Sequence, residues 1–67
     1  MEISIYSKPN CVFCDKAKMK LRKHNPKIYM LDKDYNRDDF FKKFPQARTF
    51  PQIIINNEKV GGYQELE

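Results

Sequence analysis

The only two cysteines of this 67-residue chain, Cys11 and Cys14, are separated by two residues. A C-x-x-C pair serves as a structural disulfide, as part of a metal site, or as a reversible dithiol/disulfide couple. A disulfide that closes so short a loop would stabilise the fold by only about 2 kcal/mol, which is little for the only cross-link of a chain. A structural zinc site usually needs four thiolate or imidazole ligands. The chain adds only His24, so a metal ion would have to be shared between two chains.

A redox dithiol needs only the two cysteines and no further ligand. The sequence predicts that Cys11 begins a helix, where unpaired backbone N–H groups and the positive end of the helix dipole stabilise a thiolate. Lys8, three residues upstream, adds positive charge. Cys14 lies one helical turn further on and faces inward, so the two sulfur atoms can meet. We therefore expect Cys11 to attack a substrate disulfide and Cys14 to resolve the mixed disulfide.

The rest of the chain must supply the elements that hold this pair in place. Four segments have the pattern of strands, and two have the pattern of amphipathic helices. The strands are expected at residues 1–7, 27–32, 52–56 and 58–60, and the helices at residues 11–23 and 36–44. This β-α-β-α-β-β order predicts one α/β domain over residues 1–67, with helices packed on a mixed sheet.

Local signals mark the ends of these elements. Asn36 is expected to cap the second helix, and Asn56-Asn57 to form a tight hairpin turn. The nearly continuous apolar run at residues 28–31 suggests a strand that is buried on both faces of the sheet. Residues 63–67 have the pattern of a first helical turn.

Charge and hydropathy restrict the classes of partner. The net charge is +4, and basic residues gather between residues 16 and 27. We interpret this stretch as the solvated face of a helix, with a surface for an acidic protein as the alternative. No aromatic interleaving or base-reading motif accompanies it, so no nucleic-acid partner is expected. No apolar run approaches a membrane span of roughly 20 residues and none resembles a signal peptide, so we expect a cytoplasmic protein without a membrane partner.

Three motifs together are similar to a known family. The segment YSKPNCVFC, residues 6–14, resembles the glutaredoxin active-site segment Y-[ST]-K-x-x-C-P-Y-C. Thr49-Phe50-Pro51-Gln52 resembles the family's T-V-P-Q segment, and Gly61-Gly62 its G-G motif. The motifs occur in the family's order and spacing and cover nearly the whole chain. The chain thus resembles a dithiol glutaredoxin, nearest to the small phage-like members.

The resemblance implies a thioredoxin-like α/β fold, in which a four-stranded mixed sheet carries helices on both faces. It also implies a cis peptide bond at Phe50-Pro51. Family members usually continue into a closing helix, so we expect the C-terminal helix to be truncated and part of the apolar face to be exposed or covered by a second chain. The implied activity is a glutathione-dependent reduction of protein disulfides or glutathione mixed disulfides, in electron transport and cell redox homeostasis. Ribonucleotide reductase is a natural protein partner for such a donor.

The resemblance also assigns binding roles by position. Glutathione would lie in a groove beside the nucleophile, with Lys8 on a glutathione carboxylate and Arg37 as a helper, although both could be plain surface charge. Phe50 would offer its backbone groups to the tripeptide. The catalytic residues are then Cys11 and Cys14, and the expected glutathione-binding residues are Lys8, Phe13, Arg37, Thr49, Phe50, Pro51, Gly62, Tyr63 and Gln64.

Two departures from the family pattern keep alternatives open. Val12 replaces the usual proline, and Gln64 stands where an aspartate commonly pairs with the glutathione ammonium. Gln64 motivates a redoxin that thioredoxin reductase serves instead of glutathione. Val12 leaves open a dimer that holds an iron–sulfur cluster through Cys11 of each chain and two glutathiones. Without that cluster we expect no metal, and a monomer or a weak dimer.

Overall fold

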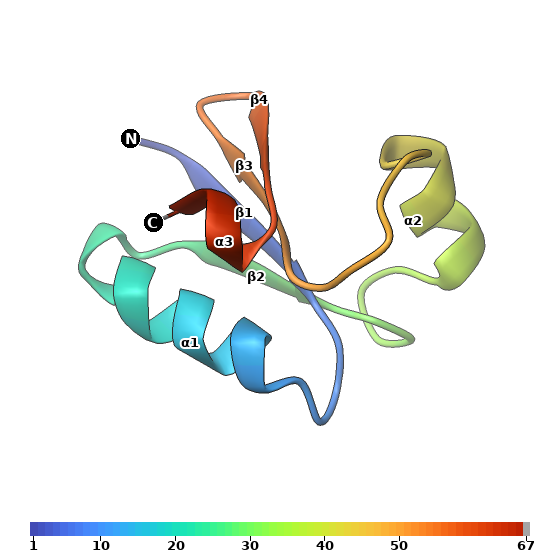
Figure 1. Ribbon diagram of the computed structural model, residues 1–67, viewed down its shortest axis with the longest axis horizontal. Helices are drawn as coiled ribbons and strands as arrows, with labels where there is room; N and C mark the ends of the chain where they lie inside the picture. Colours follow the sequence, from blue (N-terminus) through green and yellow to red (C-terminus); the bar gives the residue numbers. More distant parts are fainter. Residues whose placement is uncertain (67) are drawn as a thin grey trace.

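The chain forms a four-stranded sheet with helices packed against it, as Figure 1 shows for the computed structural model, which describes residues 1–66. The strands are β1 (Ile3–Ser7), β2 (Lys27–Met30), β3 (Gln52–Ile55) and β4 (Glu58–Gly61). The helices are α1 (Val12–Leu21), α2 (Arg37–Lys43) and α3 (Tyr63–Leu66), and the short 3₁₀ turn η1 (Arg22–His24) follows α1. The strand order is β2-β1-β3-β4. β1 runs parallel to β2 and antiparallel to β3, which pairs antiparallel with β4.

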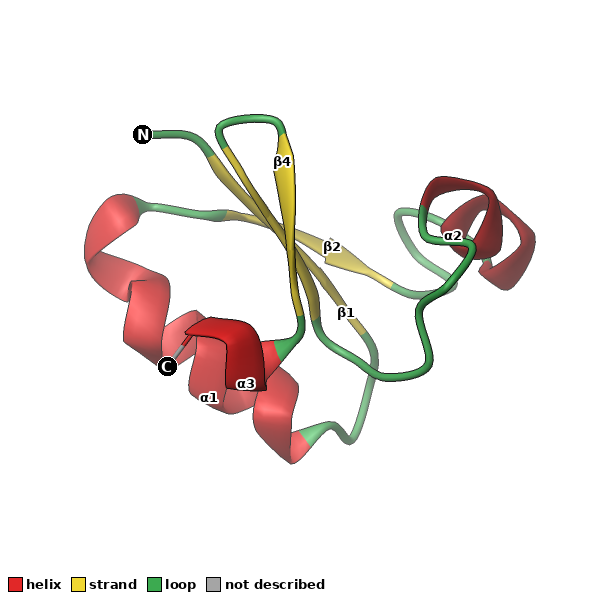
Figure 2. Cartoon of the chain, turned by 45° about the horizontal axis from the view of Figure 1, so that its top comes forward, coloured by secondary structure: helices red, strands yellow, loops and turns green. Residues whose placement is uncertain are grey.

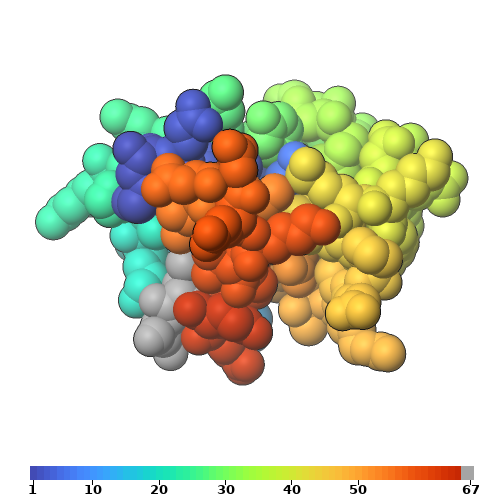
Figure 3. All heavy atoms as spheres, turned by 90° about the horizontal axis from the view of Figure 1, so that it is seen from above, coloured from blue at the N-terminus to red at the C-terminus, as the bar shows by residue number. Residues whose placement is uncertain are grey.

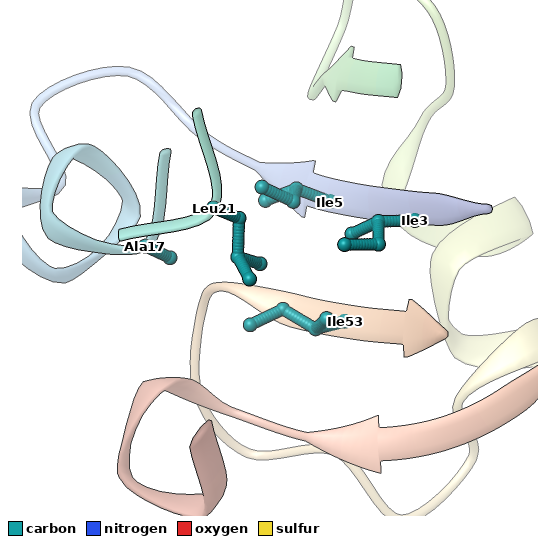
Figure 4. Close-up of a cluster of buried hydrophobic side chains, with 5 residues drawn as sticks. All are labelled: Ile3, Ile5, Ala17, Leu21 and Ile53. Atoms are coloured by element: carbon teal, nitrogen blue, oxygen red, sulfur yellow. The ribbon is translucent and has the colours of Figure 1, made fainter. Parts of the chain in front are cut away.

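The hydrophobic core lies between α1 and one face of the sheet. Ile3 and Ile5 alternate along β1 and so point to the same face, where Ile53 of β3 joins them (Figure 4). Ala17 and Leu21 are four residues apart on α1 and cover these isoleucines from the helix side. Burial of each large aliphatic side chain contributes about 1.5–3 kcal/mol, so this cluster holds α1 and the active-site segment before it on the sheet.

Aromatic side chains cover the opposite face. Tyr6 of β1 packs edge-on against Phe44, which follows α2, with ring centroids 5.1 Å apart. Tyr35 and Phe40 continue the cluster, and the Phe40 ring stacks on Phe50 at 4.5 Å. Figures 1 and 2 accordingly show α1 and α3 on one side of the sheet and α2 on the other. The expected mixed sheet with helices on both faces is confirmed.

Most local signals act as expected. The Asn36 side chain accepts a hydrogen bond from the Asp39 backbone N–H at 2.8 Å and so caps α2. Asn56 and Asn57 both have positive φ, 50° and 68°, as a two-residue hairpin turn with the twist of the sheet requires. The expected helical turn near the C-terminus is α3, although residue 67 of that prediction lies outside the described residues.

The prediction for the strand after α1 is wrong in one respect. Residues 28–31 were expected to be buried on both faces, but β2 is an edge strand, and 43% of Ile28 is exposed. The apolar side chains of β2 instead pack against neighbouring side chains of β1 on each face of the sheet. Tyr29 stacks on Tyr6 with ring centroids 4.9 Å apart, and the Met30 sulfur accepts a hydrogen bond from the Ser7 hydroxyl. None of the helices in residues 1–66 is long and apolar enough to cross a membrane.

Candidate active site

Cys11 is the N-cap residue of α1. Its backbone is extended, with φ −121° and ψ 107°, and its Sγ accepts a hydrogen bond from the Cys14 backbone N–H at 3.2 Å. Its carbonyl oxygen accepts a further bond from the Asp15 N–H at 3.2 Å, which closes the first turn of the helix. The Cys11 sulfur therefore lies at the N-terminal end of a helix, with a backbone N–H group pointing at it.

Cys14 is completely buried, whereas Cys11 is partly exposed, and both are free thiols. The pKa of Cys14 is raised to about 12, mainly by burial and also by the hydrogen bond with Cys11, while the Lys8 backbone N–H partly opposes the shift. At neutral pH Cys14 therefore carries its proton. The geometry supplies an accessible sulfur and a protonated buried sulfur, which fits the predicted attacker and resolver.

The Phe50-Pro51 peptide bond is cis, as expected, and brings a distant segment against the nucleophile. The Cys11 thiol donates to the Phe50 carbonyl oxygen, with a sulfur–oxygen distance of 3.8 Å, across 39 positions of sequence. Pro51 is buried and is packed in turn by the turn between β4 and α3. A side-chain carbon on Gly62 would come within 3.3 Å of the Pro51 carbonyl oxygen, so glycine permits this close approach.

A hollow of about 500 Å³ opens beside Cys11, and we call it the basic hollow. The expected site residues that it brings together are Lys8, Cys11, Phe13, Arg37, Thr49 and Phe50. The Lys8 ammonium nitrogen lies 5.5 Å from the centroid of the Phe50 ring, close enough for a cation–π interaction. Two further lining residues, Phe41 and Arg48, were not predicted as site residues. Their roles depend on how α2 and the connection after it fold back towards Cys11, which no local pattern reveals.

A smaller hollow of about 140 Å³ is also lined by Phe50. Three more of the expected site residues line it, namely Gly62, Tyr63 and Gln64. It shares Phe13, Thr49 and Phe50 with the basic hollow. The Phe13 and Tyr63 rings stack between the two helices with centroids 5.7 Å apart. Pro51, the other expected residue of this segment, lines neither hollow.

Glu65 lines the smaller hollow as well and was not predicted. Its carboxylate accepts a hydrogen bond from the Gly62 backbone N–H at 3.0 Å. The signal that could have found it is its place three residues after a glycine that begins a helical turn, the spacing at which a Glu side chain reaches back to an N-cap N–H. The two hollows thus differ in charge, with cations in one and a carboxylate in the other. Among residues 1–66, no group of three or more His, Cys, Asp and Glu side chains gathers as metal ligands do.

Comparison with known proteins gives the same family. The family model described as Glutaredoxin matches residues 3–60. Glutaredoxin-1 of Rhizophagus irregularis is 35% identical over 69 residues, which span 96% of this chain and 68% of that protein. Glutaredoxin 1 of Rickettsia prowazekii is 39% identical over 69 residues, which span 96% of this chain and 72% of that protein.

Solved structures agree on the fold. Glutaredoxin 1 from Francisella tularensis, determined in complex with cacodylate, superposes with a TM-score of 0.80 at 28% identity, over 97% of this chain and 86% of that one. Reduced Escherichia coli glutaredoxin gives a TM-score of 0.75 at 23% identity, over 98% and 88% of the two chains. The arrangement of strands and helices is therefore thioredoxin-like.

Proposed function

Because this chain belongs to the glutaredoxin family and is a thiol–disulfide oxidoreductase, we propose that glutathione supplies its electrons and that protein disulfides or glutathione mixed disulfides receive them. The observation that best supports glutathione is a pair of hollows that share Phe50, one lined by Cys11 and by cations and the other by Glu65. We place this activity in the cytoplasm, in redox homeostasis.

The charges of glutathione match this arrangement. The tripeptide carries a carboxylate at its glycine end, and an ammonium and a second carboxylate at its γ-glutamyl end. Lys8 and Arg37 in the basic hollow suit the glycine carboxylate, and Glu65 in the smaller hollow suits the ammonium. Glu65 thereby offers the negative charge that Gln64 lacks. The cysteine of glutathione would lie between the hollows, beside Cys11.

The reaction proceeds through two thiol–disulfide exchanges. The Cys11 thiolate attacks one sulfur of the substrate disulfide, a Cys11–substrate disulfide forms, and the other sulfur leaves as a thiolate that takes up a proton. Cys14 then loses its proton and attacks the Cys11 sulfur, which releases the second substrate thiol and leaves a Cys11–Cys14 disulfide. Two glutathione thiols reduce this disulfide in the same way and end as glutathione disulfide.

The test is a glutathione-coupled assay of the wild type and of Cys11→Ser and Cys14→Ser, with one small glutathione mixed disulfide and one protein disulfide. Cys11→Ser is expected to lose at least about a thousandfold on both substrates, because a hydroxyl does not replace the thiolate nucleophile. Cys14→Ser should lose turnover on the protein disulfide but retain activity on the mixed disulfide, which glutathione itself resolves. Full activity of Cys11→Ser would show that this mechanism is wrong.

The partner proposals extend from the same activity. We propose ribonucleotide reductase as one disulfide-bearing partner, and the assay tests it when that oxidised enzyme is the substrate. Turnover with thioredoxin reductase and without glutathione would instead support the alternative reductant. A cluster-bridged dimer would show visible-range absorption after anaerobic purification, together with twice the monomer mass.

A further inference from the structure

The basic hollow contains more positive charge than one carboxylate requires. Lys8, Arg37 and Arg48 line it, and no Asp or Glu among the described residues does. Lys8 precedes Cys11 on one wall, and Arg37 begins α2 on the other. Arg48 is exposed and lies on the connection between α2 and β3, just before the Thr49-Phe50 segment. If Lys8 and Arg37 hold the single glycine carboxylate of glutathione, Arg48 is a surplus cation at the edge of the site.

The same hollow has exposed apolar walls. Of the six large apolar side chains that are well exposed among residues 1–65, three line it, namely Val12 (66% exposed), Phe13 (49%) and Phe41 (46%). Val12 and Phe13 come from the first turn of α1 and Phe41 from α2, so they flank the hollow from two elements. Exposed apolar side chains that gather beside a reactive group, with charged residues around them, mark a surface that binds a partner.

We propose that the basic hollow is also the docking surface for protein substrates, and that it selects an extended segment with acidic residues and one bulky apolar residue next to the disulfide. The acidic side chains pair with Arg48 and its neighbouring cations, and the apolar side chain packs against Phe13 and Phe41. This inference rests on the proposed function, because it concerns the substrate of the same dithiol. It adds that charge, as well as the disulfide, decides which proteins are reduced.

The chemistry of the step is unchanged and balances without glutathione. The Cys11 thiolate attacks the disulfide of the docked segment, Cys14 completes the exchange, and the reduced protein becomes oxidised as the segment gains two electrons and two protons. A single turnover therefore reports docking and exchange alone. Since opposite charges accelerate encounter, the selectivity appears in the second-order rate and weakens with added salt.

The experiment compares two synthetic peptides, each with one internal disulfide and the same leucine beside a cysteine. One carries glutamates around the disulfide and the other carries lysines at the same places. The reduced protein is mixed with each peptide without glutathione, and product thiols are followed by rapid quench and mass spectrometry. The acidic peptide is expected to react at least about tenfold faster at low ionic strength. The two rates should converge to within about twofold at 1 M salt, where the Debye length falls to about 3 Å.

Variants assign the effect to the hollow. Arg48→Glu should slow the acidic peptide about tenfold and accelerate the basic one, and Phe41→Ala should slow both about fivefold. The matched control is Lys23→Glu, which makes the same change in net charge on an exposed residue of η1. Lys23 is twelve positions after Cys11, roughly 18 Å away at about 1.5 Å per residue, so the variants are compared at about 0.1 M salt, where the Debye length is about 10 Å and the effect of Lys23→Glu should stay within twofold.

Equal rates for the two peptides at low salt would overturn the proposal, and so would equal effects of Arg48→Glu and Lys23→Glu. These outcomes are distinct from failure of the proposed function. A protein that prefers the acidic peptide in a single turnover, but that glutathione cannot reduce again, would support the docking surface and refute glutathione as the reductant. Normal glutathione turnover combined with equal peptide rates would refute the docking surface alone.

Discussion

Cys11 and Cys14 differ in what surrounds their sulfur atoms, and this difference divides the work between them. The Cys11 sulfur is partly exposed at the start of α1 and accepts a backbone N–H, whereas the Cys14 sulfur is enclosed by the fold. In the proposed mechanism the accessible Cys11 sulfur attacks the incoming disulfide, and the buried, protonated Cys14 thiol does not compete with it. Cys14 then attacks the mixed disulfide formed one helical turn away.

The burial of Cys14 predicts a pH-dependent stability for the reduced protein. Folding raises the Cys14 pKa from its ordinary value of 9.0 to about 12, so the folded state holds this proton more tightly than the unfolded state does. The resulting stabilisation is complete below about pH 9 and is lost as the pH rises towards 12, at no more than about 1.4 kcal/mol per pH unit. Urea unfolding under reducing conditions from pH 7 to pH 11 should show it.

Cys14→Ala is the control for that experiment. Alanine at this position has no proton to lose, so the variant should lose less stability than the wild type between pH 9 and pH 11. Tyr6, whose pKa is raised by burial and by Tyr29, is common to both proteins. The pKa of Tyr35 is raised mainly by burial and partly by the charge of Cys14, so the variant also reduces the smaller of these two contributions. Identical pH profiles for the two proteins would contradict the prediction.

At the scale of elements, α2 is held on the sheet mainly by side chains. Its aromatic residues pack on Tyr6 and Tyr35, and Lys59 reaches over from β4. The Lys59 ammonium donates to the Lys43 carbonyl oxygen at the end of α2 and lies 5.4 Å from the centroid of the Phe44 ring. In Figure 3 the surface of β4 (orange) accordingly adjoins that of α2 and the connection after it (yellow). Since α2 carries three residues of the basic hollow, its attachment affects the site.

Lys59→Met should therefore loosen α2. The variant loses one charge-assisted hydrogen bond and one cation–π contact, and we expect it to lose about 1–2 kcal/mol of stability. Amide hydrogen exchange should accelerate in α2, most clearly at the Phe44 N–H, which bonds to the Phe40 carbonyl. The control is Lys42→Met, at an exposed position of α2 itself. Equal exchange rates in the two variants would show that Lys59 does not hold this helix.

The elements that could be predicted from the sequence are those whose signals are local. The i, i+4 spacing of Ala17 and Leu21 and the cap at Asn36 each act within a few residues. Strand order is not local, and for this reason the burial of β2 was predicted wrongly. Arg48 and Glu65 were not predicted for the same reason, because each reaches the site through the packing of segments that are distant in sequence. For the motif residues around Cys11 the family resemblance supplied this distant information, and their roles stay predictions.

At the scale of the whole molecule, a small core must hold everything together. The radius of gyration is 10.8 Å, close to the roughly 10.9 Å expected for a compact chain of this length. A chain this small buries only about 60% of its unfolded surface, so its margin of stability is narrow. Large apolar side chains that remain well exposed include Met19 (73%) and Ile28 (43%), as well as the three that line the basic hollow.

The narrow margin makes single core residues decisive. Ile53 is completely buried in the cluster beneath α1. Ile53→Ala should lose about 3 kcal/mol, because the lost burial adds to the cost of the cavity left behind. Met19→Ala, at a position that is 73% exposed, should change stability by less than about 0.5 kcal/mol. Urea denaturation of both variants measures this, and similar midpoints would contradict the assignment of the core.

The bond between the Cys11 thiol and the Phe50 carbonyl has a consequence for the timing of the reaction. In the reduced protein the protonated thiol donates a hydrogen bond to this oxygen. A thiolate or a disulfide sulfur has no proton to donate. Loss of the Cys11 thiol proton therefore also leaves the Phe50 carbonyl oxygen without this hydrogen-bond donor. The Phe50 carbonyl oxygen can then accept a hydrogen bond from a backbone N–H of the incoming molecule when that molecule reaches the Cys11 sulfur.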